Sequence, residues 1–181
     1  EARAQVIEKA SERLDGPIDI LVNNAAAAMY GEVADMPLKR RRLLFELNVH
    51  APLDLAQAAI PAMRAEREGW IVNVSSASHY RAKGIDWGAL RSTTKSFTAM
   101  HEYEVSKLAN VLFTKELARG KAGAGVHSYS LHPGGVASDV WRRIPWPFTP
   151  LLKLFLLSNE EGALTSLHCA TSPDVAGEDG L

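Results

Sequence analysis

The chain has 181 residues, 46% of them hydrophobic, and its 20 lysines and arginines nearly balance its 21 aspartates and glutamates, for a formal net charge of −1. This composition predicts one globular domain with a substantial core, and it gives no support for a nucleic-acid-binding surface. The single cysteine, Cys169, excludes an internal disulfide and a metal site built from thiolates.

The first part of the sequence predicts a helix followed by a buried strand. Residues 3–14 carry apolar side chains at helical spacing, and Gly16-Pro17 ends that pattern. The short apolar run Ile18–Val22 then predicts a buried strand. We expect Asn23-Asn24 to begin the loop at the carboxyl end of this strand.

The middle of the sequence repeats the pattern with a longer helix. Residues from Leu38 to about Arg67 are expected to be helical, with a break or bend near Pro52 and Pro61. The apolar run Trp70–Val74 predicts a second buried strand, which ends in Ser75-Ser76.

The last third predicts one long helix, a third strand and two short helices. Helical spacing extends over His101–Arg119, and the strand Val126–Leu131 leads into the exit loop His132–Gly135. Two short helices are expected over Leu151–Leu157 and Glu160–Ala170.

Strands that alternate with helices predict parallel βαβ units, with helices on both faces of one sheet. Ligands of such sheets bind outside the carboxyl ends of the strands. Three polar clusters fall at these ends, namely Asn23-Asn24, Ser75-Ser76 and His132-Pro133-Gly134. Their convergence is the first indication of a functional site.

Tyr103 and Lys107 are four residues apart, so a helix places them on one face. An ammonium beside a phenol favours the phenolate, and we expect Lys107 to lower the pKa of Tyr103. The pair then forms a tuned general acid and base. The alternative for such a common spacing is an exposed tyrosine beside a solvated lysine.

Two further polar positions are ambiguous when each is taken alone. Ser75 and Ser76 follow a buried strand, where serine hydroxyls also serve simply to cap the backbone. Asn48 lies inside a helical stretch, where asparagine is mildly disfavoured and is commonly an exposed polar residue.

The ordered series of motifs resembles the short-chain dehydrogenase/reductase family over essentially the whole chain. The series is Asn23-Asn24-Ala25, Asn48, Ser75-Ser76, Tyr103-x-x-x-Lys107 and Pro133-Gly134. The resemblance implies a Rossmann-type, doubly wound parallel α/β sheet. It also implies an NAD- or NADP-dependent oxidoreductase that transfers a hydride between nicotinamide and a carbonyl or alcohol.

The resemblance assigns four catalytic residues. Ser76 would donate a hydrogen bond to the carbonyl oxygen, and Tyr103 would deliver the proton. Lys107 would keep the pKa of Tyr103 low and bind the nicotinamide ribose. The backbone of Asn48 would hold a water that resupplies the proton.

The resemblance also assigns residues to cofactor binding, in addition to Tyr103 and Lys107. The turn Asn23–Ala26 resembles a segment that passes beside the cofactor, although Ala26 replaces the family's glycine. The second segment, Pro133–Ser138, resembles the family's segment around the nicotinamide. Together the two segments contribute Asn23, Ala25, Pro133, Gly134, Val136 and Ser138.

Parts of the second half resemble the retinol-dehydrogenase-like branch, which implies a lipophilic or retinoid-like substrate. The resemblance lies in Tyr103–Leu117, Leu131–Gly135 and Thr165–Ala170, and in the long insert between Ser76 and Tyr103. The resemblance further implies a homodimer or homotetramer that pairs through the two long helices.

The family's glycine-rich turn, T-G-x-x-x-G-x-G, is absent from this sequence. We therefore expect residues 1–181 to be a single partial Rossmann-fold domain that is truncated at both ends. The alternative to an active enzyme is a non-catalytic binding or regulatory fragment of the same fold.

Two segments have further interpretations. Trp141–Leu157 is rich in tryptophan, phenylalanine and proline and predicts a substrate lid or packing over the sheet, with membrane-surface contact as the alternative. Lys39–Arg42 is interpreted as a solvated helix start rather than a phosphate site. Because no signal peptide and no apolar run of about 18 residues is visible, we expect a cytoplasmic location.

Overall fold

The computed structural model describes residues 3–28, 38–88, 100–120, 125–137 and 156–180. In this part of the chain, helices and strands alternate as the sequence predicts. The elements that build the fold are α1 (Ala4–Leu14), β1 (Ile20–Asn23), α2 (Leu38–Phe45), η2 (Glu46–His50), α3 (Ala51–Glu66), β2 (Gly69–Val74), η3 (Ala77–Arg81), α4 (Met100–Arg119), β3 (Val126–Leu131) and α6 (Asn159–Thr171).

The three strands form one parallel sheet in the order β1-β2-β3. The register pairs Asn23 with Asn73 and Val74 with Leu131, so β2 and β3 end side by side. The predicted parallel sheet is confirmed, and the part of it that the structure describes corresponds to an incomplete Rossmann fold.

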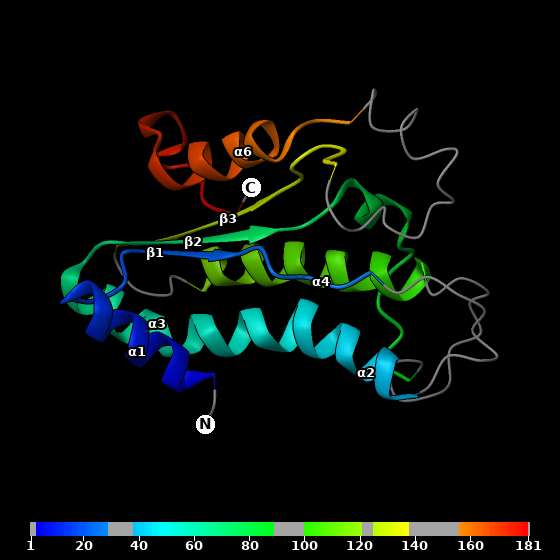
Figure 1. Ribbon diagram of the computed structural model, residues 1–181, viewed down its shortest axis with the longest axis horizontal. Helices are drawn as coiled ribbons and strands as arrows, with labels where there is room; N and C mark the ends of the chain where they lie inside the picture. The colour runs from blue at the N-terminus through cyan, green and yellow to red at the C-terminus, as the bar shows by residue number, and fades with distance from the viewer. Residues whose placement is uncertain (1–2, 29–37, 89–99, 121–124, 138–155, 181) are drawn as a thin grey trace.

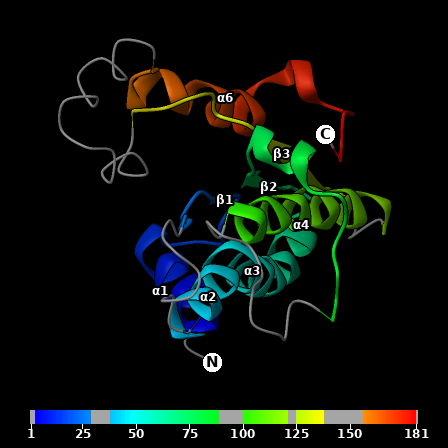
Figure 2. The same ribbon diagram turned by 90° about the vertical axis from the view of Figure 1, so that its right-hand side faces the viewer.

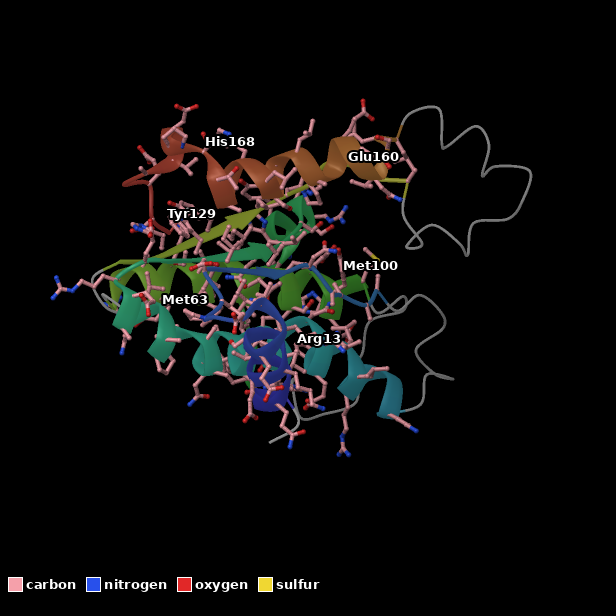
Figure 3. All side chains as sticks on the ribbon, turned by 60° about the vertical axis from the view of Figure 1, so that its left-hand side comes forward. Arg13, Met63, Met100, Tyr129, Glu160 and His168 are labelled. Carbon is pink, nitrogen blue, oxygen red and sulfur yellow. The ribbon has the colours of Figure 1, made fainter. Side chains whose placement is uncertain are left out.

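Helices cover both faces of the sheet, which also confirms the prediction. The helices α1, α2, α3 and α4 lie on one face and α6 lies on the other (Figures 1 and 2). Each face buries its own apolar cluster. Met63 belongs to the cluster on the α3 side and Tyr129 to the cluster beneath α6, and Figure 3 shows these two residues on opposite sides of the sheet.

The region expected to be one helix bent at its prolines has a different organisation. It is continuous from Leu38 to Glu66, but residues 46–50 form a π-helix between α2 and α3. The Ala51 N–H donates to the carbonyl of Glu46, five residues back. Pro52 follows the π-helix directly, in the first turn of α3, and Pro61 lies inside α3. The irregularity expected near Pro52 is therefore present, because a proline within a continuous helix removes a hydrogen bond to the preceding turn.

The two edges of the sheet differ. Among the described residues β1 has no partner strand on its outer side, and Ile20 and Val22 remain 37% and 43% exposed. On the outer side of β3, the Gly180 N–H donates to the Ser128 carbonyl at 2.9 Å. The end of the chain therefore begins to pair with β3.

The segment predicted as a short helix over residues 151–157 is only partly described. Leu157 is not helical, because it forms an isolated parallel bridge with Val136. Its N–H donates to the Gly135 carbonyl and its carbonyl accepts from the Ala137 N–H, both at 2.8 Å. The lid or membrane-contact hypothesis for Trp141–Leu157 otherwise lies outside the described residues. Within the described ranges, no helix is long and apolar enough to span a bilayer.

Candidate active site

The predicted site residues gather where the sheet ends and α4 begins. The carboxyl ends of the strands point toward the side of the molecule where α4 starts (Figure 1), and Met100, the first residue of α4, lies on this side (Figure 3). Tyr103 and Lys107 belong to the first two turns of α4, and Ser76 follows β2. The strand ends and the helix face that carries Tyr103 and Lys107 thus meet at one place.

The Ser76 and Tyr103 side chains are near enough for hydrogen bonding to Ser76 to affect the Tyr103 phenol. Burial raises the pKa of the Tyr103 phenol above its ordinary value, and the hydrogen bond from Ser76 offsets part of that effect. The expectation that Lys107 would lower the pKa of Tyr103 is therefore wrong for this structure. At neutral pH the phenol is protonated, as a proton donor must be.

Lys107 is buried behind Tyr103 with its ammonium bound to the sheet. Its Nζ donates to the Val74 carbonyl at 2.8 Å and lies 5.7 Å from the centroid of the Tyr103 ring. Burial lowers the pKa of Lys107 to about 8, because the charged form loses its hydration.

The two adjacent serines have different partners. The Ser75 hydroxyl is buried and donates to the Lys107 carbonyl at 2.8 Å, so Ser75 fastens α4 to the end of β2. Ser76 instead caps η3 by accepting from the Ser78 N–H at 3.2 Å, and its side chain also reaches Tyr103. Among the described contacts, the Ser76 hydroxyl interacts with the Tyr103 phenol and the Ser75 hydroxyl does not.

Asn48 lies at the centre of the π-helix with its side-chain amide fully engaged. Its Oδ1 accepts from the Ala27 N–H at 2.8 Å, and its Nδ2 donates to the Ala27 carbonyl at 2.9 Å and to Ser106 Oγ at 3.0 Å. Ser106 in turn donates to the Tyr103 carbonyl at 2.7 Å. The sequence analysis did not identify Ser106 as a site residue. The only indication in the sequence was its position directly before Lys107.

Asn23 is buried at the end of β1 and holds the sheet together instead of facing outward. Its Nδ2 donates to Asn73 Oδ1, and Asn73 Nδ2 donates to Thr114 Oγ1, both at 2.9 Å. This ladder joins β1, β2 and α4. The sequence analysis also did not predict the roles of Asn73 and Thr114. An asparagine inside an apolar strand could have indicated a buried hydrogen-bonded side chain at Asn73.

The two segments expected to line the cofactor follow β1 and β3. Ala25 is exposed, and Ala26 has an ordinary backbone, because among the described non-glycine residues only Asp15 and Arg67 have positive φ. The alanine that replaces the family's glycine therefore introduces no strain.

The second segment contains one position that requires glycine. Gly134 has a φ of 87°, which L-residues rarely adopt. Pro133 is half-buried beside it, and Val136 is held by its bridge to Leu157. Ser138 lies outside the described residues.

Two histidines near the strand ends had no predicted role. His79 Nδ1 lies 2.7 Å from the Ser76 carbonyl, and because a carbonyl only accepts, this nitrogen carries the proton. The pKa of His132 is lowered, first by burial and then by the charge of His79. Among the described residues, no cluster of three or more His, Cys, Asp or Glu side chains could hold a metal ion.

Comparisons with known proteins agree with this geometry. The family model described as short chain dehydrogenase matches residues 1–146. Human retinol dehydrogenase 11 is 37% identical over 161 residues, which are 84% of this chain and 48% of that protein. Human retinol dehydrogenase 12 is 38% identical, with 84% and 48% coverage. The chain thus spans about half the length of these curated relatives.

Solved structures share the fold at lower sequence identity. A gluconate 5-dehydrogenase from Burkholderia cenocepacia superposes with a TM-score of 0.75 at 22% identity, covering 98% of this chain and 66% of that one. A 3-oxoacyl (acyl-carrier-protein) reductase from Agrobacterium tumefaciens gives a TM-score of 0.75 at 22% identity, with 99% and 66% coverage.

Proposed function

Because the chain belongs to the short-chain dehydrogenase family, we propose that the protein is an NAD- or NADP-dependent oxidoreductase that interconverts a carbonyl and an alcohol. One observation carries this proposal. Tyr103 interacts with Ser76 and adjoins the buried ammonium of Lys107 at the carboxyl end of a parallel sheet.

Each of these side chains has a role that follows from its chemistry. The Ser76 hydroxyl donates a hydrogen bond to the carbonyl oxygen of the substrate, which polarises the carbonyl. The Tyr103 phenol, which its raised pKa keeps protonated at neutral pH, gives its proton to that oxygen during reduction. Two hydrogen bonds within η3 hold Ser76 in place. His79 Nδ1 donates to the Ser76 carbonyl, and the Ser78 N–H donates to Ser76 Oγ.

The donor set at Lys107 fits a nicotinamide cofactor. Val74 takes one of the three N–H groups of the ammonium, and among the described residues the other two have no acceptor. Two free donors beside a phenol suit a diol such as a ribose. A bound nicotinamide would supply or accept the hydride at the carbonyl carbon. The similar gluconate 5-dehydrogenase and 3-oxoacyl reductase were both solved with NADP, which supports this choice.

For the substrate we favour a lipophilic aldehyde or ketone, or the matching alcohol. The support is the similarity to two human retinol dehydrogenases over 84% of the chain. The motifs around Tyr103 and Thr165–Ala170 resemble the same branch. A cytoplasmic location remains part of this proposal.

Turnover by the full-length protein tests the function. Oxidation of NADH or NADPH is followed with retinaldehyde, nonanal and cyclohexanone as substrates. We expect turnover with at least one of them, and the Tyr103→Phe variant should lose about 100-fold or more in kcat while still binding cofactor. Tyr129→Phe is the matched control, because it removes a buried tyrosine hydroxyl that bonds to Val175 on the α6 side of the sheet. Wild-type turnover in Tyr103→Phe would refute the role of Tyr103. No turnover by the wild-type protein with any combination of these cofactors and substrates would refute the proposed function.

A further inference from the structure

Ser106 lies at the junction of three segments that sequence alone does not connect. Its side chain is fully buried in α4, and both of its hydrogen-bonding capacities are used. The hydroxyl donates to the Tyr103 carbonyl at 2.7 Å and accepts from Asn48 Nδ2 at 3.0 Å. It therefore joins the turn that carries Tyr103 to the π-helix η2.

Asn48 extends this connection to the loop after β1. The Ala27 N–H can donate only to an oxygen, so the hydrogen bond from Ala27 fixes which amide atom is Oδ1. The Asn48 Nδ2 then has two protons, one for the Ala27 carbonyl and one for Ser106. The result is a continuous chain of hydrogen bonds from Ala27 through Asn48 and Ser106 to the Tyr103 carbonyl.

The other contacts of this part of α4 lie on the β2 side. Lys107 Nζ binds the Val74 carbonyl, and Ser75 Oγ binds the Lys107 carbonyl. These contacts fix α4 relative to β2, but they do not reach the loop after β1. Among the contacts known for the described residues, only Ser106 connects the Tyr103 turn, through Asn48, with that loop.

We propose that Ser106 is a positioning residue that holds the loop after β1 in register with Tyr103, a role that rests on the function proposed above. The loop contains Ala25, which the family resemblance assigns to the cofactor site, and Tyr103 delivers the proton in the proposed function. A small displacement between the two therefore affects cofactor binding and turnover together.

The Ser106→Ala variant removes the connection without touching any reacting group. It leaves one proton of Asn48 Nδ2 buried without its acceptor, so the amide shifts and the loop at Ala27 follows. In the full-length protein we expect kcat to fall about tenfold and the KM for nicotinamide to rise about fivefold, while the KM for the carbonyl substrate is unchanged. Ser106→Thr keeps the hydroxyl and should restore most of both parameters.

Ser128→Ala is the matched control. Ser128 is an equally buried serine whose hydroxyl also donates to a carbonyl of α4, that of Thr114, at 3.0 Å. Its loss should lower stability without changing the KM for nicotinamide. A partly unfolded sample lowers apparent kcat but does not raise KM, so the two effects are separable.

Two outcomes overturn the proposal. In the first, the wild-type protein turns over substrate and Tyr103→Phe loses this activity, but Ser106→Ala has wild-type kinetics. This outcome contradicts the role of Ser106 and leaves the proposed function intact. If the wild-type protein shows no turnover, the proposed function fails, and amide hydrogen exchange at Ala27 then tests Ser106. Exchange about tenfold faster in Ser106→Ala than in Ser128→Ala supports the positioning role. Equal exchange in the two variants overturns it.

Discussion

Lys107 shows most clearly that this site is organised at a cost in stability. Its side chain is 2% exposed, and its one described acceptor is the Val74 carbonyl. Burying an ammonium without a carboxylate partner is unfavourable, because the charge loses its hydration. Residues held in this way, with a displaced pKa, are typical of functional sites.

This burial predicts a pH-dependent stability. Burial lowers the pKa of Lys107 to about 8 from 10.5, so between these values the unfolded chain binds the proton more tightly than the folded chain. The free energy of unfolding should therefore rise with pH across this window, by at most about 3 kcal/mol. Below pH 8 the group makes no pH-dependent contribution.

Urea unfolding of the wild type and of Lys107→Met from pH 7 to 10.5 measures this contribution. The difference in unfolding free energy, wild type minus variant, should increase above about pH 8. Lys115→Met, which removes an exposed lysine from the same helix, controls for the loss of charge. A difference that stays constant with pH would show that the ammonium is not desolvated in the folded protein.

At the residue scale, sequence predicted that Tyr103 and Lys107 lie together but not which groups they contact. The spacing of Tyr103 and Lys107 placed them on one helix face, and the structure has both beside the end of β2. The direction of the Tyr103 pKa shift was wrong, because spacing does not reveal how far the phenol is buried. Ser106 was missed, because its partners Asn48 and Tyr103 are joined to it only by the fold.

Among the elements, strands were predicted more accurately than helix irregularities. The boundaries of β3 match the prediction at both ends, because the strand lies between two glycine-containing turns. The sequence predicted a break or bend near Pro52, but a proline does not specify which irregular turn forms, so the π-helix at residues 46–50 was not predicted as such. Irregular helical turns of this kind are frequent at functional sites.

The start of β3 depends on close packing against the end of α3. Gly125 precedes β3 with a φ of 94°, and a Cβ at this position would overlap the backbone carbonyl of Arg67. Gly177 has a similar φ of 91° but open space around it. These two glycines separate the cost of the backbone conformation from the cost of the overlap.

We expect Gly125→Ala to lower the free energy of unfolding by about 2 kcal/mol more than Gly177→Ala. Both variants force alanine into the same unfavourable backbone region, and only the first also displaces α3 from β3. Urea unfolding of the full-length variants measures the difference. Equal losses would mean that the two elements do not pack as closely as described.

At the scale of the whole molecule, the outer surface of α3 and α4 predicts self-association. Leu53 on α3 and Leu112 on α4 are 43% and 47% exposed on helices that cover the same face of the sheet (Figure 2). Burying such side chains between two copies is favourable. This agrees with the pairing through the two long helices that the sequence resemblance implies.

Sedimentation velocity of the full-length protein tests this pairing. We expect a dimer or tetramer, and Leu112→Glu should shift the distribution toward the monomer. Leu14→Glu introduces the same charge at an exposed leucine of α1 and should leave the assembly intact. A monomeric wild type over a wide range of concentrations would contradict the prediction.

In the proposed function, Tyr103, Ser76 and Lys107 form the proton-transfer site of a hydride-transferring enzyme. The most direct measurement uses reduced nicotinamide deuterated at C4 in the transferred position, with the full-length protein and the carbonyl compound that is reduced fastest. Mass spectrometry of the alcohol product should find one deuterium on the carbinol carbon, and Tyr103→Phe should abolish this product while cofactor binding persists. An alcohol without deuterium, or deuterium transfer at the wild-type rate in Tyr103→Phe, would contradict the account.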